Sequence, residues 1–238
     1  MSELLIPYGI HRDSRMIVEP EDAVRGRACE CICPGCKAPL IAHHCKEKRD
    51  YFAHDSKAKP EEDCPFSSAV ALAMMIRSIA PTFLGSKFHT PSYKASVPFK
   101  CCLTKAAEVV VSNSVDVVID KVETDSSSHS HKFDIQFVVR GYPIYIDLTY
   151  KGKPPVVLLE PALIAAKAGV IELDCDGFSH DQIKLDKITR YSDAVKTFVM
   201  SEGFKRWRFH PRQTKLIRKA KEDHKCKYGF DPYTMQVY

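Results

Sequence analysis

Residues 133–149 of the chain spell FDIQFVVRGYPIYIDLT, two apolar segments on either side of Arg140-Gly141. The segments 133–139 and 143–149 are rich in Ile, Val, Phe and Tyr, the residues that strands favour. A glycine in a two-residue connection is typical of a tight hairpin turn, because it accepts the positive φ angles that such turns require. The sequence therefore predicts a β-hairpin here.

The segments around this hairpin predict an α/β fold, in which helices pack on a mixed sheet. Further strands are expected at 107–112, 115–122 and 170–174, and helices at 67–79, 160–168 and 180–202. Pro81 is expected to end the first helix and Gly169 the second. Because a helix lies between strands 143–149 and 170–174, we expect a parallel pair joined by a right-handed crossover.

Length and composition exclude several classes of protein. The chain has 238 residues, of which 45% are hydrophobic and 27% charged, an ordinary globular balance. No apolar run approaches the roughly 18 residues of a membrane span, so no membrane association is expected. Met1–Arg15 lacks the basic flank and apolar stretch of a secretory signal. These features predict a folded cytoplasmic protein.

Six of the ten cysteines lie in the first 64 residues: Cys29, Cys31, Cys33, Cys36, Cys45 and Cys64. In a reducing compartment, such clustering favours metal binding over disulfides. Cys33 and Cys36 form a CxxC knuckle, whose tight turn aims both thiolates at one point. Zinc needs four such ligands, and the candidates for the other two are His43, His44, Cys45, His54 and Cys64.

We expect His54 and Cys64 to complete the zinc site, with Cys29 and Cys31 as alternative thiolates. Four protein ligands leave no open position for water, so the expected Zn²⁺ is structural. A redox role for the CxxC motif is disfavoured, because the strand-to-helix context of such motifs is missing.

Asp134 and Asp147 lie in the two strands of the predicted hairpin. Across a hairpin they can face one point, where Mg²⁺ or Mn²⁺ would find the oxygen ligands it prefers. The metal would activate water and stabilise charge on a phosphate, while Lys151 or Lys153 orients the nucleophile. Acidic residues at strand ends are also common without a catalytic role, so spacing alone leaves both interpretations open.

Positive charge is concentrated near the C-terminus. Residues 204–227 carry a net charge of +8, which leaves −3 for the rest of a chain whose total is +5. This asymmetry predicts a polyanionic partner, and a solvated basic helix is the alternative. The residues expected to contact phosphates are Lys205, Arg206, Arg208, Arg212, Lys215, Arg218 and Lys219. Core packing is the favoured interpretation for Trp207, and stacking on an unpaired base is the alternative.

Taken in order, these segments resemble the competence protein CoiA-like family. The N-terminal part of the resemblance is CPGCKAPL, then RDYFAH, then CPFSS ahead of a helix. The later part is FDIQF, YIDLTYK, VIELD and RWRFHP. They resemble, in the same order, four segments of the family: a strand ending in Asp, a strand that carries an acid with a Lys two residues on, an IEID segment and a Trp-containing tail. The resemblance spans about residues 7–211.

The resemblance implies a restriction-endonuclease-like core of the PD-(D/E)xK type, with a mixed sheet flanked by helices. We expect a zinc-finger-like module at 1–66, the nuclease-like core at 67–203 and a basic tail at 204–238. Asp134 would be the first metal-binding acid and Asp147 the second.

The sequence departs from the family pattern at two places. The family's Lys falls on Thr149 here, and Lys151 is expected to replace it from one strand step further on. The helix after Cys64 has Ser68 and Ala71 where the family often has Glu and His. An auxiliary acid is then missing, or Glu108 supplies it from the preceding strand. Glu172 and Asp174 of VIELD are expected to support the site.

The function that the resemblance implies is metal-dependent hydrolysis of DNA, in DNA processing, recombination or defence against foreign DNA. Mg²⁺ or Mn²⁺ would be the catalytic cofactor and DNA the partner. The departures at Thr149 and Ala71 motivate a second hypothesis, an inactive nuclease-fold protein that binds nucleic acid or serves in a larger complex. A zinc-stabilised interaction protein without a nucleic-acid role is the third. Other proteins or a second copy of the chain are further candidate partners.

Overall fold

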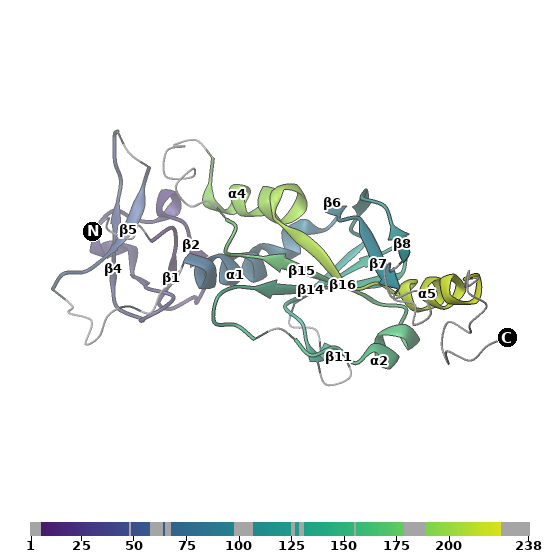
Figure 1. Ribbon diagram of the computed structural model, residues 1–238. Helices are drawn as coiled ribbons and strands as arrows, with labels where there is room; N and C mark the ends of the chain where they lie inside the picture. The colour runs from purple at the N-terminus through teal and green to yellow at the C-terminus, as the bar shows by residue number, and fades with distance from the viewer. Residues whose placement is uncertain are drawn as a thin grey trace. The chain divides into compact units, whose positions relative to one another are not determined.

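The computed structural model describes residues 6–47, 49–57, 64, 68–97, 107–124, 127–128, 131–154, 156–178 and 189–224. The chain forms two compact units, and Figure 1 labels many of their elements. The first unit comprises Met1–Phe83, Leu148–Lys153 and Asp174–Gly203, and the second Leu84–Asp147, Pro154–Leu173 and Phe204–Tyr238. Each unit is therefore built from segments far apart in the sequence. The domain boundaries expected after residues 66 and 203 stay a prediction.

The first unit begins with short strands around the cysteines. β1 (Gly9–His11) pairs antiparallel with β2 (Ile17–Val18) and β3 (Cys31–Ile32), and β4 (Leu40–His43) pairs antiparallel with β5 (Tyr51–His54). The 3-10 turns η1 (Pro20–Asp22) and η2 (Arg27–Cys29) lie between these strands in the sequence. At Gly9 the packing is so close that an added Cβ would lie 2.8 Å from the Cβ of Cys31.

Two helices supply the larger apolar core of the first unit. α1 (Ser68–Ile79) is followed by the 3-10 turn η3 (Ala80–Phe83), so the predicted helix end at Pro81 is confirmed. α4 (Tyr191–Thr197) continues as the π-helical turn η4 (Phe198–Glu202). Of the helix predicted at 180–202, residues 180–188 lie outside the described residues. Thr189 and Arg190 are not helical, because the backbone of Arg190 is extended and α4 begins only at Tyr191. The hydroxyl of Tyr8 donates to the Ala71 carbonyl at 2.8 Å and ties α1 to the N-terminal strands.

A five-stranded sheet contains the segments that the sequence singled out. Its order is β10 (Lys121–Thr124), β13 (Ile135–Val139), β14 (Tyr142–Thr149), β15 (Gly169–Asp174) and β16 (Lys205–Phe209). β13 and β14 pair antiparallel, and the two residues between them, Arg140 and Gly141, have φ angles of 50° and 81°. The predicted hairpin is therefore confirmed, with the tight turn that its sequence requires.

β14 and β15 are neighbours whose carboxyl ends lie together. The backbone N–H of Cys175, just beyond β15, donates to the carbonyl of Thr149, the last residue of β14, at 2.8 Å. The two strands are therefore parallel, as predicted, and α2 (Glu160–Ala165) lies in the connection between them.

The predicted role of Gly169 as a helix stop is wrong. α2 ends at Ala165, the left-handed residue behind it is Lys167 with a φ of 52°, and Gly169 is the first residue of β15. Glycine is required there for another reason, because a Cβ would lie 2.6 Å from the indole ring of Trp207.

Three smaller antiparallel pairs complete the second unit: β6 (Lys87–Thr90) with β9 (Val115–Val118), β7 (Tyr93–Val97) with β8 (Ala107–Ser112), and β11 (Ser127–Ser128) with β12 (His131–Lys132). The single strand expected at 115–122 is in fact two strands. The reason is a change of partner, since Ile119 bonds to the loop before β6 and Asp120 to Val138 of β13. Helix α5 (Gln213–Glu222) follows β16.

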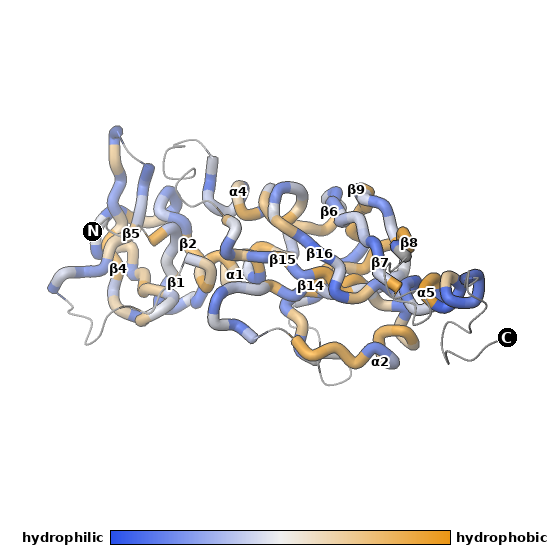
Figure 2. The backbone as a smooth tube through the Cα atoms, in the orientation of Figure 1, coloured by the Kyte–Doolittle hydropathy of each residue, from blue (hydrophilic) through white to orange (hydrophobic). Residues whose placement is uncertain are grey.

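A buried cluster holds α2 against the sheet. It consists of Phe133, Tyr145, Leu163, Ala168, Val170 and Phe209. The rings of Phe133 and Tyr145 stack at 4.5 Å. Figure 2 shows the segment that leads into α2 as a largely hydrophobic stretch, and Val156 and Leu158 of this segment pack on the cluster. None of the helices in the described part of the chain has the length and apolar character needed to cross a membrane.

Candidate metal centre and acidic sheet site

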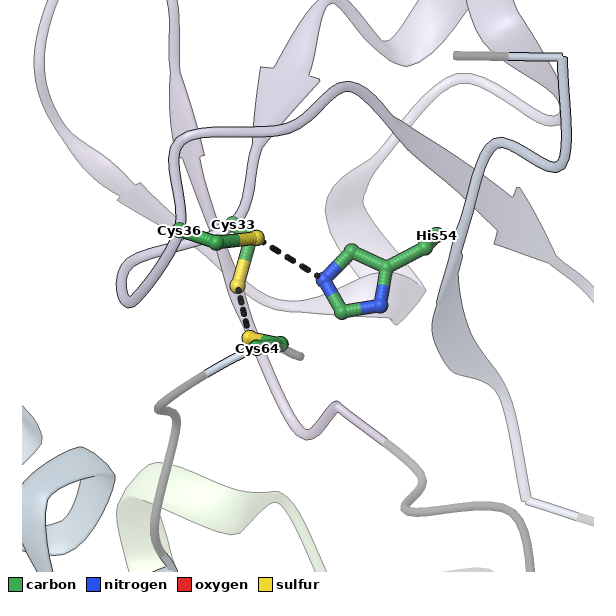
Figure 3. A group of neighbouring side chains, drawn as sticks. All are labelled: Cys33, Cys36, His54 and Cys64. Atoms are coloured by element: carbon green, nitrogen blue, oxygen red, sulfur yellow. Dashed lines mark hydrogen bonds between the residues drawn. The ribbon is translucent and has the colours of Figure 1, made fainter. Parts of the chain in front are cut away.

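The side chains of Cys33, Cys36, His54 and Cys64 converge in the first unit (Figure 3). The Sγ atoms of Cys33 and Cys64 are 3.7 Å apart, and Sγ of Cys36 lies 3.3 Å from Nε2 of His54. All four ligand atoms lie within 4.8 Å of one another. Tetrahedral zinc would separate two sulfur ligands by about 3.8 Å and a sulfur from a nitrogen by about 3.5 Å. This Cys₃His group could therefore hold a metal ion such as zinc.

Two short elements position these ligands. Cys33 directly follows β3, and the knuckle closes because its N–H donates to the Ala38 carbonyl at 2.8 Å and its carbonyl accepts from Lys37 at 3.0 Å. Lys37 adopts a left-handed φ of 63°, which turns the chain back after Cys36. His54 is the last residue of β5 and presents its ring from the neighbouring hairpin.

The ionisation of the group favours a cation. Burial raises the pKa of the Cys33 thiol to about 12, so a metal must supply the charge that stabilises its thiolate. Burial also opposes ionisation of Cys36, but hydrogen bonds from the Ala38 N–H and from the neighbouring thiols outweigh it and lower the pKa of Cys36. Burial lowers the pKa of His54, which favours the neutral imidazole that a metal ligand requires.

The alternative ligands contact other groups. The thiols of Cys29 and Cys31 donate to backbone carbonyls at 3.3 and 3.1 Å. The ring of His43 stacks on a tyrosine, and Nε2 of His44 lies 3.0 Å from a carbonyl oxygen. Among the described residues, only the predicted quartet gathers three or more possible metal ligands.

The acids of the sheet are paired with arginines. Asp147 of β14 is fully buried, and its Oδ2 lies 3.0 Å from Nη1 of Arg208 on β16. Nε of Arg208 is also 3.8 Å from Glu172 of β15, and Nη2 of Arg206 is 3.0 Å from the same carboxylate. Two carboxylates and two guanidinium groups thus alternate across three strands. The sequence analysis missed this network, and the only signal for it was the alternation of charged residues in VIELD and RWRFH.

A β-bulge makes the network compatible with the core. The register of β15 and β16 shifts between Val170, which faces Phe209, and Ile171, which faces Trp207. Arg208 is the extra residue, so strict alternation is broken at this point. Phe209 can therefore join the buried cluster beside Val170 while Arg208 reaches Asp147.

Asp134 lies directly before β13 and is buried. The register of the hairpin pairs Ile135 with Ile146, so one further step would set Asp134 opposite Asp147. The described residues nevertheless hold no group of three acids close enough for one ion.

Two other expected positions differ in the structure. β14 ends at Thr149, and Lys151 lies in a turn where its backbone N–H donates to Asp176 at 2.7 Å. The prediction that the strand continues far enough to place Lys151 on the same face as the acids is therefore wrong. Lys153 donates from Nζ to the Leu148 carbonyl.

Glu108 is not on the sheet of the candidate acids. It lies on β8, which pairs with β7, and its carboxylate is 3.2 Å from Nζ of Lys94. The expectation that Glu108 enters the site from a neighbouring strand is therefore wrong. Ala71 is fully buried in α1, and Ser68 is the first residue of that helix.

The basic residues fall into two groups. The strand residues have partners inside the unit: Lys205 is buried with its ammonium 5.6 Å from the ring of Phe88, and Arg206 and Arg208 hold the sheet acids. Arg212 donates to the Val111 carbonyl at 2.8 Å. The helix residues Lys215, Arg218 and Lys219 are exposed on α5.

The aromatic residues of this segment serve packing. Phe209 is fully buried, and the indole N–H of Trp207 donates to the Pro91 carbonyl at 2.8 Å while its ring covers Gly169. Trp207 is half-buried and its ring packs against Gly169, so the structure favours packing for this residue.

Comparison with known proteins gave no relative: no family model matches the chain, and neither a curated protein nor a solved structure is similar enough to count as a match.

Proposed function

We propose that the chain is a zinc-stabilised nucleic-acid-binding protein, built on a nuclease-like sheet, that does not use its sheet acids for cleavage. One observation carries the proposal. Asp147, the residue expected to bind the catalytic metal, has no exposed surface and is neutralised by Arg208 at 3.0 Å.

Mg²⁺ and Mn²⁺ do not fit the acids in this arrangement. Mg²⁺ demands octahedral oxygen ligands and keeps several waters, which a fully buried carboxylate cannot share. One oxygen of Asp147 is already bonded to a guanidinium, and Lys151 lies in a turn beyond the strand. We therefore derive no cleavage step through a metal at this site.

Zinc fits the Cys₃His group, and its role would be structural. Four protein ligands close the coordination sphere and leave no position for a reacting water. When bound, the metal would join the Cys33 knuckle, the end of β5 and Cys64 through three thiolates and one imidazole. Because these segments form a site only in the folded chain, metal binding adds to the stability of the first unit.

The exposed basic residues of α5 are the surface proposed for nucleic acid. Within the described part of the chain, no acid of the sheet pairs with Lys215, Arg218 or Lys219, although Arg218 has a weak surface pair with Glu222 at 3.6 Å. Such residues attract phosphates by releasing counterions, and this attraction does not depend on base sequence. Since Trp207 and Phe209 are used in packing, we expect no base stacking from this segment.

Cleavage of DNA is the second candidate function, and one observation favours it. The four later motifs of the sequence become four neighbouring strands, β13 to β16, in chain order. Asp147 and Glu172 therefore lie on adjacent strands. Cleavage would require Arg208 to leave Asp147 so that an ion could enter beside Asp134.

Gel retardation with single- and double-stranded DNA tests the proposal. The variant K215Q/R218Q/K219Q is compared with R12Q/R15Q/R25Q, which removes three exposed charges from the first unit. Loss of three phosphate contacts should reduce the slope of log K against log salt by about 3 in the α5 variant alone. An equal change in both variants would contradict the assignment of α5.

The same preparations are incubated with DNA in Mg²⁺, Mn²⁺ or EDTA, beside D147N. We expect no cutting in any of them. Metal-dependent cutting that disappears in D147N would overturn the proposal and establish the second candidate.

A further inference from the structure

Three polar side chains are joined by hydrogen bonds on the antiparallel pair of β6 and β9. His89 and Asp116 face each other in the strand register, and Nδ1 of His89 lies 2.8 Å from Oδ1 of Asp116. Nε2 of the same ring lies 2.7 Å from Oγ of Ser114, the residue just before β9. A hydroxyl, an imidazole and a carboxylate are thus joined by two short hydrogen bonds.

The direction of these hydrogen bonds follows from what each group can donate. An ionised carboxylate only accepts, so Nδ1 of His89 must carry the proton in its bond to Asp116. In the neutral ring Nε2 is then a bare acceptor, and the hydroxyl of Ser114 donates to it. The other acceptor near this hydroxyl, the carbonyl of Thr90, is more distant at 3.0 Å. Ser114, His89 and Asp116 are thus arranged like a nucleophile, its general base and the group that orients the base.

We propose that Ser114 is a nucleophilic serine activated by His89, with Asp116 as the positioning residue, and that its substrates are small activated esters. The side chains of His89 and Asp116 are 47% and 59% exposed, and Ser114 is exposed too. A small electrophile therefore reaches the hydroxyl without a pocket. The proposal uses the second unit alone and does not depend on nucleic-acid binding.

The chemistry balances without a cofactor. Oγ of Ser114 forms a bond to the ester carbonyl carbon while its proton passes to Nε2 of His89. The imidazolium returns this proton to the leaving alkoxide as the carbon–oxygen bond breaks, which leaves an acyl-serine. Water then attacks the acyl-serine by the same proton route, releases the acid and restores the hydroxyl.

The chain contains a matched set that lacks this alignment. Ser14, His11 and Glu30 are the same kinds of residue, also near the surface. Here Oγ of Ser14 lies 3.2 Å from Nδ1, and Glu30 is 3.8 Å from Nε2, beyond hydrogen-bond distance. The backbone N–H of Ser14 also points at Nδ1, at 3.3 Å. Ser14 therefore serves as the control serine.

The test is covalent labelling of the full zinc-loaded chain with a fluorophosphonate probe, with the adduct located by mass spectrometry. We expect one adduct, on Ser114, which is absent in S114A and unchanged in S14A. Because a general base contributes about 10²-fold or more, H89Q should slow labelling by about that factor, and D116N should slow it less. Circular dichroism of each variant verifies the fold, and heat-denatured chain should not react.

Two results would overturn the proposal. One is labelling of Ser14 at the same rate as Ser114, which would show only the background reactivity of exposed serines. The other is labelling of Ser114 that is unaffected in both H89Q and D116N, since the aligned hydrogen bonds would then contribute nothing to reactivity. Turnover of p-nitrophenyl acetate, lost in S114A, would extend the result from one acylation to repeated hydrolysis.

Discussion

Replacing Arg208 by Met tests the pairing on which the proposed function depends. The substitution removes the guanidinium and keeps most of the apolar stem. It leaves the carboxylate of Asp147, which has no exposed surface, without the countercharge that now lies 3.0 Å away. Opposite charges about 4 Å apart interact by about 4 kcal/mol at an effective dielectric constant of 20. Breaking one partner of a buried pair costs about 3–5 kcal/mol. Because the side chain of Arg208 is 20% exposed, we expect the lower end, about 3 kcal/mol.

A double-mutant cycle separates this pairing from general damage to the core. Asp147→Asn in the Arg208→Met background removes the buried negative charge, so the double variant should recover about 2 kcal/mol of the loss. The control cycle uses Lys94 and Glu108, whose side chains are 62% and 67% exposed although their atoms are 3.2 Å apart. Exposed pairs contribute about 0–1 kcal/mol, so the control coupling should be much smaller.

The chain provides its own probe for this measurement. Trp207 is the only tryptophan, lies in the second unit and is adjacent to Arg208, so its fluorescence reports unfolding of that unit. Urea titrations of the four zinc-loaded proteins yield the coupling energy. A coupling no larger than that of Lys94 and Glu108 would refute the argument that Arg208 neutralises Asp147. The argument against metal binding at this carboxylate would then fail with it.

The remaining predictions concern zinc, packing and pH. Cys36→Ser should reduce the bound zinc below one ion per chain, as measured by metal analysis, and lower the melting temperature, as measured by calorimetry. The control variant Asp147→Asn should retain the zinc. Gly169→Ala should destabilise the second unit by about 1–3 kcal/mol in urea titrations, because the added Cβ would lie 2.6 Å from the Trp207 ring. In the control variant Gly177→Ala, the added Cβ makes only an ordinary contact with a backbone oxygen at 3.8 Å. Burial, and secondarily a nearby guanidinium, lowers the pKa of His210 from 6.5 to about 4. On acidification, the unfolded chain therefore protonates this histidine at a higher pH than the folded chain does. The contribution of His210 to the free energy of unfolding is complete above pH 6.5 and should fall by up to about 3 kcal/mol as the pH drops to 4. His210→Asn should remove this pH dependence.

Local signals explain which parts of the fold were predictable. The hairpin around Arg140-Gly141 depends on strand propensity and on a two-residue turn, both of which neighbouring residues determine. The division of 115–122 into β9 and β10 depends on a change of partner from β6 to β13, which no local pattern records. In the strand Lys205–Phe209, charged and aromatic residues alternate from Arg206 onward with a period of two, but the positive charge of the segment favoured its interpretation as a basic tail.

The same distinction holds for the sites. Thiolates and imidazole have few roles as a cluster other than metal binding. Ligand chemistry therefore selected, from several candidates, the four residues that the structure brings together: Cys33, Cys36, His54 and Cys64. Carboxylates and arginines have many roles, and their partners depend on geometry. The position expected for Lys151 required β14 to continue for two more residues, and the sequence does not show where a strand ends.

A buried carboxylate pair needs positive charge, and a metal ion and a guanidinium are alternative ways to supply it. In a site that holds a metal ion, a lysine can orient the metal-bound water. A site neutralised by Arg208 has no such water. The β-bulge that brings Arg208 to Asp147 supplies the positive charge that this buried carboxylate needs. It also moves the available positive charge of the C-terminal segment away from β16, since Arg206 and Arg208 are neutralised within the sheet. The positive potential that attracts a polyanion would therefore come from α5. For this reason, the salt dependence of binding should be set by Lys215, Arg218 and Lys219 and not by the total basic charge of the segment.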